Sequence, residues 1–136
     1  MTVRLTRAVS FRAHHRLFDP TLSAEANRAR FGWTTEPHPH QYRCEVTVSG
    51  PVDARVPMVI DLATFDRILA EEVVGPLDGR HLHRDVPAFR EVLPTCEGIA
   101  RELFRRVAGR LPAGVTLERV AVAEDETLHA ECLGPL

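Results

Sequence analysis

The sequence predicts an α+β fold in which an antiparallel sheet is covered by helices on one face. The chain has 136 residues, which is the size of one domain, so we expect residues 1–136 to fold as a unit. Segments of alternating polar and apolar residues lie near both ends, and two segments of helical periodicity lie between them. Strands grouped around a central pair of helices are typical of an antiparallel sheet rather than of parallel βαβ units.

The strands are predicted from alternation with a period of two residues. They are expected at residues 2–15, 41–49, 56–60, 117–124 and 127–132. The second strand stops at Gly50-Pro51, and the short third segment would pair back across Gly50. The last two strands are separated by Asp125-Glu126, which predicts a tight acidic turn.

Two amphipathic helices are expected between the strands. Asp61 is a candidate N-cap, and apolar residues at helical spacing follow it until Gly75-Pro76, where we expect the helix to stop. Thr95 is the candidate N-cap of the second helix, which should end near Gly109. A shorter helix after Ser23 lies within the long connection between the first two strands, and long connections are often functional.

Composition excludes several classes of function. All seventeen basic residues are arginine, so enzymes that need a Schiff-base lysine or a P-loop lysine are excluded. The formal net charge of −2 provides no overall positive field, so we expect no nucleic-acid partner. No apolar run approaches the roughly 20 residues that span a bilayer, and the N-terminus lacks a signal peptide. We therefore expect a soluble cytoplasmic protein with no membrane partner.

The histidines are the first residues that suggest chemistry. His38 and His40 are two positions apart where the chain enters the strand predicted at 41–49, and residues with this spacing on a strand point to the same side. A histidine from the neighbouring strand would complete three metal ligands and leave one position open, as in a catalytic zinc site. On spacing alone, the alternative is a pair of solvated loop histidines.

Several motifs resemble one known family. The segment Phe11-Arg-Ala-His-His-Arg-Leu17 resembles the F-x-x-x-H-R-L motif of the 6-pyruvoyl tetrahydropterin synthase and 6-carboxytetrahydropterin synthase family. Further segments match the family's H-G-H-N-Y, MVxDL, PLDHxxLxxDVP and PTxE motifs and its late-strand glutamate. In order, they are His38–Tyr42, Met58–Leu62, Pro76–Pro87, Pro94–Glu97 and Glu124. The resemblance covers nearly the whole chain, and several motifs in the right order are more specific than any one alone.

The resemblance implies a T-fold, which is a four-stranded antiparallel sheet with two helices packed on one face. Its other face would line a tunnel in a homo-oligomer, most often a hexamer with active sites between subunits. By the same resemblance, His15, His38 and His40 would bind zinc, and Glu124 would bind the guanidine-like edge of a pterin. A carboxylate suits that edge because it accepts two parallel hydrogen bonds. Three neighbouring residues would lie beside the pterin: Thr95, Cys96 and Glu97.

The sequence departs from this family at the groups that transfer protons. The position of the family's catalytic cysteine is Thr34, and the relay histidine is replaced by Gly79, although Asp78 remains. A threonine hydroxyl is far less acidic than a thiol and needs its own base. Glu36 is a candidate substitute base, as a glutamate is in one branch of the family, and His81 is a candidate relay. The alternative is that both are solvated loop residues.

Cys96 offers another candidate thiolate, because it directly follows the predicted N-cap of a helix. We prefer the interpretation that it is a small residue packed at the helix start. The other cysteines are Cys44 and Cys132, and the three match neither a disulfide framework nor a metal-binding C-x-x-C pattern.

Three hypotheses about function remain open at this point. The leading one is a protein that binds a pterin-like ligand but does not catalyse the parent reaction of the family. The second is an active zinc-dependent lyase that acts on 7,8-dihydroneopterin triphosphate, or a related compound, with substitute bases. The third is a scaffolding oligomer whose pocket is no longer used.

Overall fold

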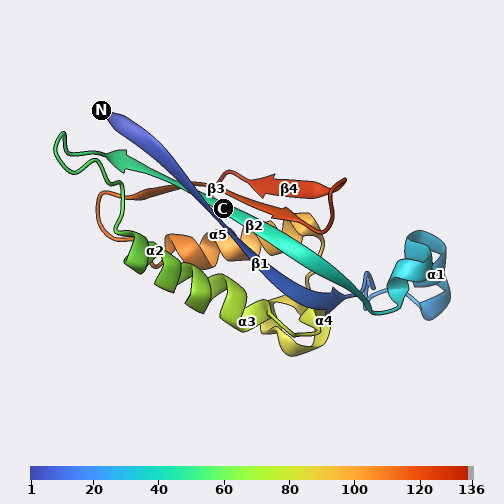
Figure 1. The fold of residues 1–136 in the computed structure, drawn as a ribbon. Helices are drawn as coiled ribbons and strands as arrows, with labels where there is room; N and C mark the ends of the chain where they lie inside the picture. The colour runs from blue at the N-terminus through green and yellow to red at the C-terminus, as the bar shows by residue number, and fades with distance from the viewer. Residues whose placement is uncertain (135–136) are drawn as a thin grey trace.

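The computed structural model describes residues 1–134, which form one four-stranded antiparallel sheet with helices on one face (Figure 1). The strands are adjacent in the order β1-β2-β3-β4. Their bounds are Thr2–His15 for β1, His38–Pro51 for β2, Thr116–Ala123 for β3 and His129–Cys132 for β4. The predicted α+β class, with an antiparallel sheet and one covered face, is therefore confirmed.

The pairing of β1 with β2 is the longest in the sheet, and it extends beyond β3. Its register runs from Thr2 opposite Pro51 to His15 opposite His38. The β2–β3 ladder ends where Arg43 pairs with Ala123, so the first residues of β2 pair with β1 alone. This overhanging end of the sheet carries the histidines that the sequence analysis selected.

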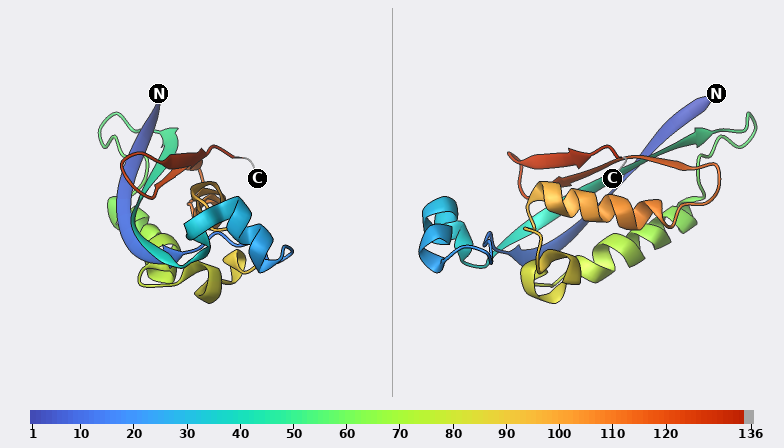
Figure 2. Two further views of the ribbon diagram at one scale, coloured as in Figure 1. Left: turned by 90° about the vertical axis from the view of Figure 1, so that its right-hand side faces the viewer. Right: turned by 180° about the vertical axis from the view of Figure 1, so that it is seen from behind.

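Two helical rods cover one face of the sheet and run alongside each other (Figure 2). The first consists of α2 (Leu62–Leu69), the π-helical turn η2 (Ala70–Val74) and α3 (Gly75–Leu77), and the second is α5 (Cys96–Ala108). Both predicted N-caps are confirmed. The Asp61 carboxylate accepts from the Thr64 N–H, and the Thr95 hydroxyl accepts from the Gly98 N–H, each at 3.1 Å.

The core lies between these rods and the sheet. It contains apolar side chains from the covered face of β2 and β3 and from the inward faces of both rods. Its fully buried members include Tyr42, Phe65, Leu69, Ile99, Leu103, Val46 and Val107. None of the helices in residues 1–134 is long and apolar enough to cross a membrane.

The predicted stop at Gly75-Pro76 is wrong, because the helical rod continues to Leu77. The Gly75 N–H bonds to the Ala70 carbonyl five residues back, which makes a π turn. A Cβ atom on residue 75 would lie 2.9 Å from that carbonyl oxygen, so glycine permits the close approach. Pro76 is then in the first turn of α3, where a missing N–H is tolerated.

The predicted strand at residues 56–60 is also wrong. The chain between Pro51 and Asp61 forms bends and loops without strand pairing. The Asp53 carboxylate accepts from the backbone N–H groups of Arg55 and Val56 at 2.6 and 3.3 Å. This side chain turns the backbone away from the extended conformation that pairing across Gly50 would require.

The long connection between β1 and β2 holds a helical projection, α1 (Ala24–Phe31) followed by the 3-10 turn η1 (Gly32–Thr35). The Ser23 hydroxyl caps α1, as predicted. The projection lies beyond the end of β1 and β2, away from the main body (Figures 1 and 2). Two short helical turns, α4 (Leu82–Asp85) and η3 (Pro87–Phe89), connect the two rods.

Candidate metal centre

Three histidines converge at the overhanging end of the β1–β2 ladder. His15 pairs with His38 in the register, and His40 lies two residues further along β2 on the same face. One ring nitrogen from each residue lies within 4.8 Å of the others, so the three could hold a metal ion. Pro39 is accommodated between them because β3 does not reach this part of β2. The pairing of two strands thus places three imidazoles together.

Backbone carbonyls orient two of these rings. The Nδ1 atom of His15 lies 2.7 Å from the carbonyl oxygen of Pro94, and the Nδ1 atom of His38 lies 2.8 Å from that of Glu36. A carbonyl oxygen only accepts hydrogen bonds, so Nδ1 carries the hydrogen in both rings. Each Nε2 atom then carries a lone pair. Metal-binding histidines commonly have this tautomer, because their other ring nitrogen donates its hydrogen to a carbonyl or carboxylate.

Burial keeps His15 in the form that binds metals. The residue is only 2% exposed, and this burial is the main cause that lowers its pKa from 6.5 to about 4. The ring is therefore neutral at pH 7. The Nε2 atom of His40 is buried, and it has no hydrogen-bond partner among the described residues. Buried polar atoms are normally satisfied, so an orphaned nitrogen among three converging imidazoles fits a metal ion.

Glu124 directly follows β3 and lies against this histidine cluster. Its Oε2 atom lies 3.5 Å from Nε2 of His40 and 3.7 Å from Nε2 of His15. The side chain is 16% exposed, so part of it remains accessible. Because the rest of β3 pairs with β2, the position at the end of β3 falls beside the start of the histidine-bearing strand.

The residues expected beside a pterin lie at the start of α5. The Thr95 hydroxyl caps the helix, Glu97 is exposed, and Cys96 is buried. Burial, with the charge of Glu124 as a further cause, raises the pKa of the Cys96 thiol to about 12. A neutral packed thiol agrees with the structural interpretation of Cys96 and not with a thiolate.

Tyr42 is a site residue that the sequence analysis did not select. It is the next residue on the same face of β2 after His38 and His40, and its ring centroid lies 5.5 Å from that of His40. Its hydroxyl is buried, and no hydrogen-bond partner exists for it within residues 1–134. Burial and the carboxylate of Glu124 raise its pKa, so the hydroxyl remains a donor. The two-residue spacing that revealed the histidine pair was the signal that could have found it.

The candidate proton-transfer residues have local partners within this chain. The Asp78 carboxylate accepts from the Arg12 N–H at 2.9 Å, and the Thr34 hydroxyl donates to the Phe31 carbonyl at 2.6 Å. The exposed Glu36 carboxylate lies 3.6 Å from a guanidinium nitrogen of Arg28.

Two aromatic contacts lie next to the metal centre. The ring of His81 stacks on that of His14, with centroids 4.5 Å apart and planes within 12° of parallel. Trp33 on η1 lies close to His38, with ring centroids 4.8 Å apart, although the residue is 71% exposed. The indole therefore stands beside the cluster with most of its surface open.

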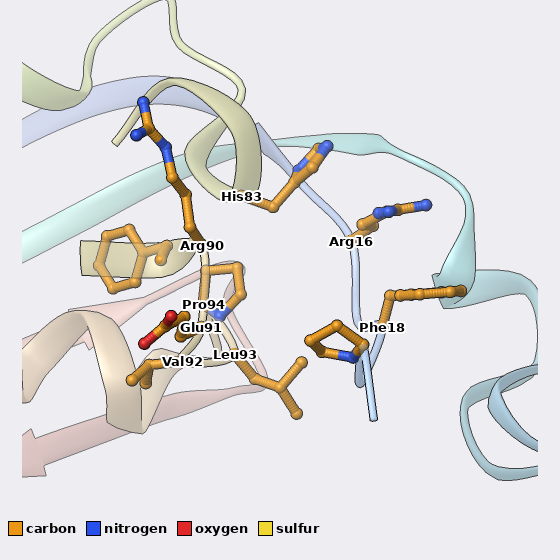
Figure 3. Close-up of a pocket in the computed structure, with 10 residues that line it drawn as sticks. Arg16, Phe18, His83, Arg90, Glu91, Val92, Leu93 and Pro94 are labelled. Carbon is orange, nitrogen blue, oxygen red and sulfur yellow. The ribbon is translucent and has the colours of Figure 1, made fainter. Parts of the chain in front are cut away.

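A basic cavity of about 110 Å³ adjoins the cluster through Pro94, whose carbonyl orients His15. Arg16, His83 and Arg90 line it, together with Phe18 (Figure 3). The guanidinium of Arg16 lies 4.3 Å from the centre of the Phe18 ring. Burial chiefly, and then Arg16, lower the pKa of His83. The cavity thus gathers positive charge beside the histidine cluster, although Glu91 also lines it.

Comparison with solved structures defines the class of fold. The 6-pyruvoyl tetrahydropterin synthase of Caenorhabditis elegans superposes with a TM-score of 0.92 over 99% of this chain and 97% of its own, at 29% sequence identity. The synthase of Plasmodium vivax superposes with a TM-score of 0.68 over 97% of each chain, at 14% identity. The molecule is a T-fold protein, as the family resemblance implied.

The sequence comparison narrows that class to one family. The family profile described as 6-pyruvoyl tetrahydropterin synthase matches residues 4–135, and the chain belongs to that family. The human 6-pyruvoyl tetrahydrobiopterin synthase is 38% identical over 125 residues, which cover 90% of this chain and 86% of the relative. The corresponding protein of Drosophila melanogaster is 32% identical over 122 residues, which cover 88% of this chain and 73% of the relative.

Proposed function

We propose that this protein binds a pterin at a zinc ion held by His15, His38 and His40. The observation that carries this proposal is the convergence of three imidazole nitrogens, two of them with tautomers set by backbone carbonyls. Zinc bound in this way supplies a positive charge that polarises oxygen atoms of the ligand. The neutral His15 and the orphaned His40 nitrogen provide the donors that zinc prefers.

Recognition of the pterin ring is assigned to Glu124. Its side chain is partly exposed, and a carboxylate can accept two parallel hydrogen bonds from the guanidine-like edge of the ring. The start of α5, with Thr95, Cys96 and Glu97, forms the neighbouring wall. In a homo-oligomer with sites between subunits, as we propose for the hexamer, a second copy would close the open side.

The adjoining cavity indicates a phosphorylated ligand such as 7,8-dihydroneopterin triphosphate. Arginine guanidinium groups bind phosphate through paired N–H donors, and Arg16 and Arg90 supply two such groups. Within the described residues, no ion pair joins either arginine to a carboxylate, so their charges remain available.

We further propose that the family's parent reaction is slow in this protein. Thr34 uses its hydroxyl to bond the Phe31 carbonyl, and Gly79 has no side chain with which to move a proton. A positioned acid or base contributes about 10²–10⁴-fold to each proton transfer, so the absence of two such groups costs a large part of the rate. The function we propose is therefore pterin binding with little turnover.

The second candidate is an active lyase that uses substitute groups. The 38% identity to the human synthase favours it, because this similarity extends over 90% of the chain. In that case Glu36 is the base, and Asp78 with His81 is the relay, contributed across a subunit boundary. Glu36→Gln would then abolish product formation while leaving pterin affinity unchanged.

The decisive experiment is a fluorescence titration of zinc-loaded protein with neopterin and with 7,8-dihydroneopterin triphosphate, followed by mass spectrometry of the products. We expect saturable binding that Glu124→Ala abolishes and that the control Glu126→Ala retains, since Glu126 is an exposed residue of the adjacent turn. Binding without product supports the first candidate, and product formation supports the second. Absence of binding to the wild-type protein would contradict both and favour the scaffolding role.

A further inference from the structure

We propose that Glu124 is a fourth ligand of the metal ion in the pterin-free protein. Its carboxylate then closes the coordination position that three histidines alone would leave open. This inference rests on the proposed histidine metal centre, and it gives Glu124 a second role besides ring recognition. The supporting observation is the contact of the Glu124 carboxylate with His15 and His40.

The distances from Glu124 to His15 and to His40 are those of ligands that share an ion rather than of hydrogen bonds. Oε2 of Glu124 lies 3.5 Å from Nε2 of His40 and 3.7 Å from Nε2 of His15. An N–H···O hydrogen bond would bring these atoms to about 2.7–3.2 Å. Two ligands bonded to one tetrahedral zinc at about 2.0–2.1 Å lie roughly 3.3–3.4 Å apart. The observed separations are within a few tenths of an ångström of the second value.

The facing atoms of His15 and Glu124 fit a cation between them. The hydrogen of the His15 ring is on Nδ1, where it is donated to the Pro94 carbonyl, so Nε2 presents a lone pair. The carboxylate oxygen opposite is also an acceptor. Two acceptors that face each other in a largely buried site repel, unless a positive charge accepts electron density from both.

Within the described part of the chain, no arginine forms an ion pair with the Glu124 carboxylate. Its ion-pair contacts within residues 1–134 involve only His15 and His40. By contrast, Glu45 and Glu131 on the same sheet both pair with the guanidinium of Arg119, at 3.1 and 2.7 Å. The backbone of Glu124 is held by a hydrogen bond to the Leu128 carbonyl, which keeps the residue at the site.

One consequence is that ring recognition and metal access are coupled. A pterin whose guanidine-like edge engages the Glu124 carboxylate would draw that side chain away from the three histidines. Glu124 would then no longer fill the position that the histidines leave open. A ligand without the matching edge would meet a closed centre, which would make Glu124 a determinant of specificity.

The test measures zinc affinity by chelator competition and the visible spectrum of the Co²⁺-loaded protein. We compare the wild type with Glu124→Gln, Glu124→Asp, His38→Ala and the matched control Glu126→Gln. Loss of an outer-shell partner typically costs about 10–100-fold in metal affinity, so loss of a direct ligand should cost at least 10-fold. Glu124→Gln should show that loss with a changed cobalt spectrum, Glu124→Asp a smaller change, and Glu126→Gln none. Neopterin should alter the wild-type cobalt spectrum.

The outcomes separate this inference from the metal centre itself. If Glu124→Gln retains the affinity and cobalt spectrum of the wild type while His38→Ala loses the metal, the centre stands and the fourth ligand is refuted. If His38→Ala also retains the metal, the proposed centre fails and the fourth ligand fails with it. Circular dichroism of each metal-free variant shows whether a loss arises from misfolding instead.

Discussion

Adjacent histidines at the end of β1 belong to two different arrangements. His15 faces the covered side and converges with His38 and His40, and we call these three residues the inner cluster. His14 faces the other way and stacks on His81, and we call these two the outer pair. Rings of the inner cluster meet at steep angles, between 69° and 89°, whereas the rings of the outer pair are nearly parallel.

This difference shows how strand geometry decides the chemistry of identical side chains. Consecutive residues of a strand point to opposite faces of the sheet. His15 is therefore buried on the covered face, whereas His14 points to the other face. In the inner cluster, carbonyls fix the free nitrogen atoms so that they point toward a common centre. In the outer pair, the two rings stack face to face and stabilise each other through their π systems. A histidine-rich sequence therefore needs its register before it predicts a metal site.

The largest expected effect is on the reactivity of the buried thiols of Cys44 and Cys96. Burial raises the pKa values of Cys44 and Cys96 to about 12, so both are protonated at pH 8. At that pH only about one molecule in 10⁴ carries either thiolate. We expect a thiol-specific reagent to modify the half-exposed Cys132 at least about 1000-fold faster than the other two. Rapid labelling of all three in folded protein would contradict the assigned burial.

A smaller effect is expected on zinc affinity, which should depend on the inner cluster and not on the outer pair. His40→Ala should lower zinc affinity by at least about 100-fold. Loss of a residue that only hydrogen-bonds to a metal ligand typically costs about 10–100-fold, and a direct ligand should matter more. The matched change His81→Ala should leave affinity unaltered. Equilibrium dialysis against a zinc buffer measures both variants. Equal losses in the two would mean that the outer pair also supports the metal.

The smallest expected effect is on the stability of the metal-free protein. His81→Ala removes one stacked ring at a partly exposed edge and should lower the free energy of unfolding by about 0.5–1 kcal/mol. That corresponds to a decrease of roughly 2–4 °C in Tm for a domain of this size. Thermal unfolding with a chelator present measures the shift. A loss of several kcal/mol would show that the outer pair has a larger structural role.

Local signals were sufficient to predict most of the fold. Capping side chains at Ser23, Asp61 and Thr95 begin their helices where the sequence indicated, because each bond involves residues three apart. The misassigned stop at Gly75-Pro76 depended on a hydrogen bond to residue 70 that simple periodicity does not reveal. The misassigned strand failed because one Asp53 carboxylate competes for backbone N–H groups.

The candidate site was only partly predictable for a similar reason. His38 and His40 follow from spacing within one strand, whereas choosing His15 over His14 required the family resemblance. The contact of Glu124 with two histidines, and the buried hydroxyl of Tyr42, depend on how three strands and a helix start come together. The roles of Glu36 and Asp78 stay predictions, and within this chain their carboxylates contact Arg28 and Arg12.

The position of Trp33 would make the proposed metal centre accessible to fluorescence. It is the only tryptophan in the chain, and its ring lies 4.8 Å from that of His38. All tryptophan emission therefore originates beside the inner cluster, within the range over which a bound Co²⁺ or Cu²⁺ ion quenches an excited indole. A pterin absorbs light in the range where indole emits, so its arrival would also reduce the emission by energy transfer. The indole of Trp33 is therefore an intrinsic probe that would report the proposed metal and pterin binding without any label.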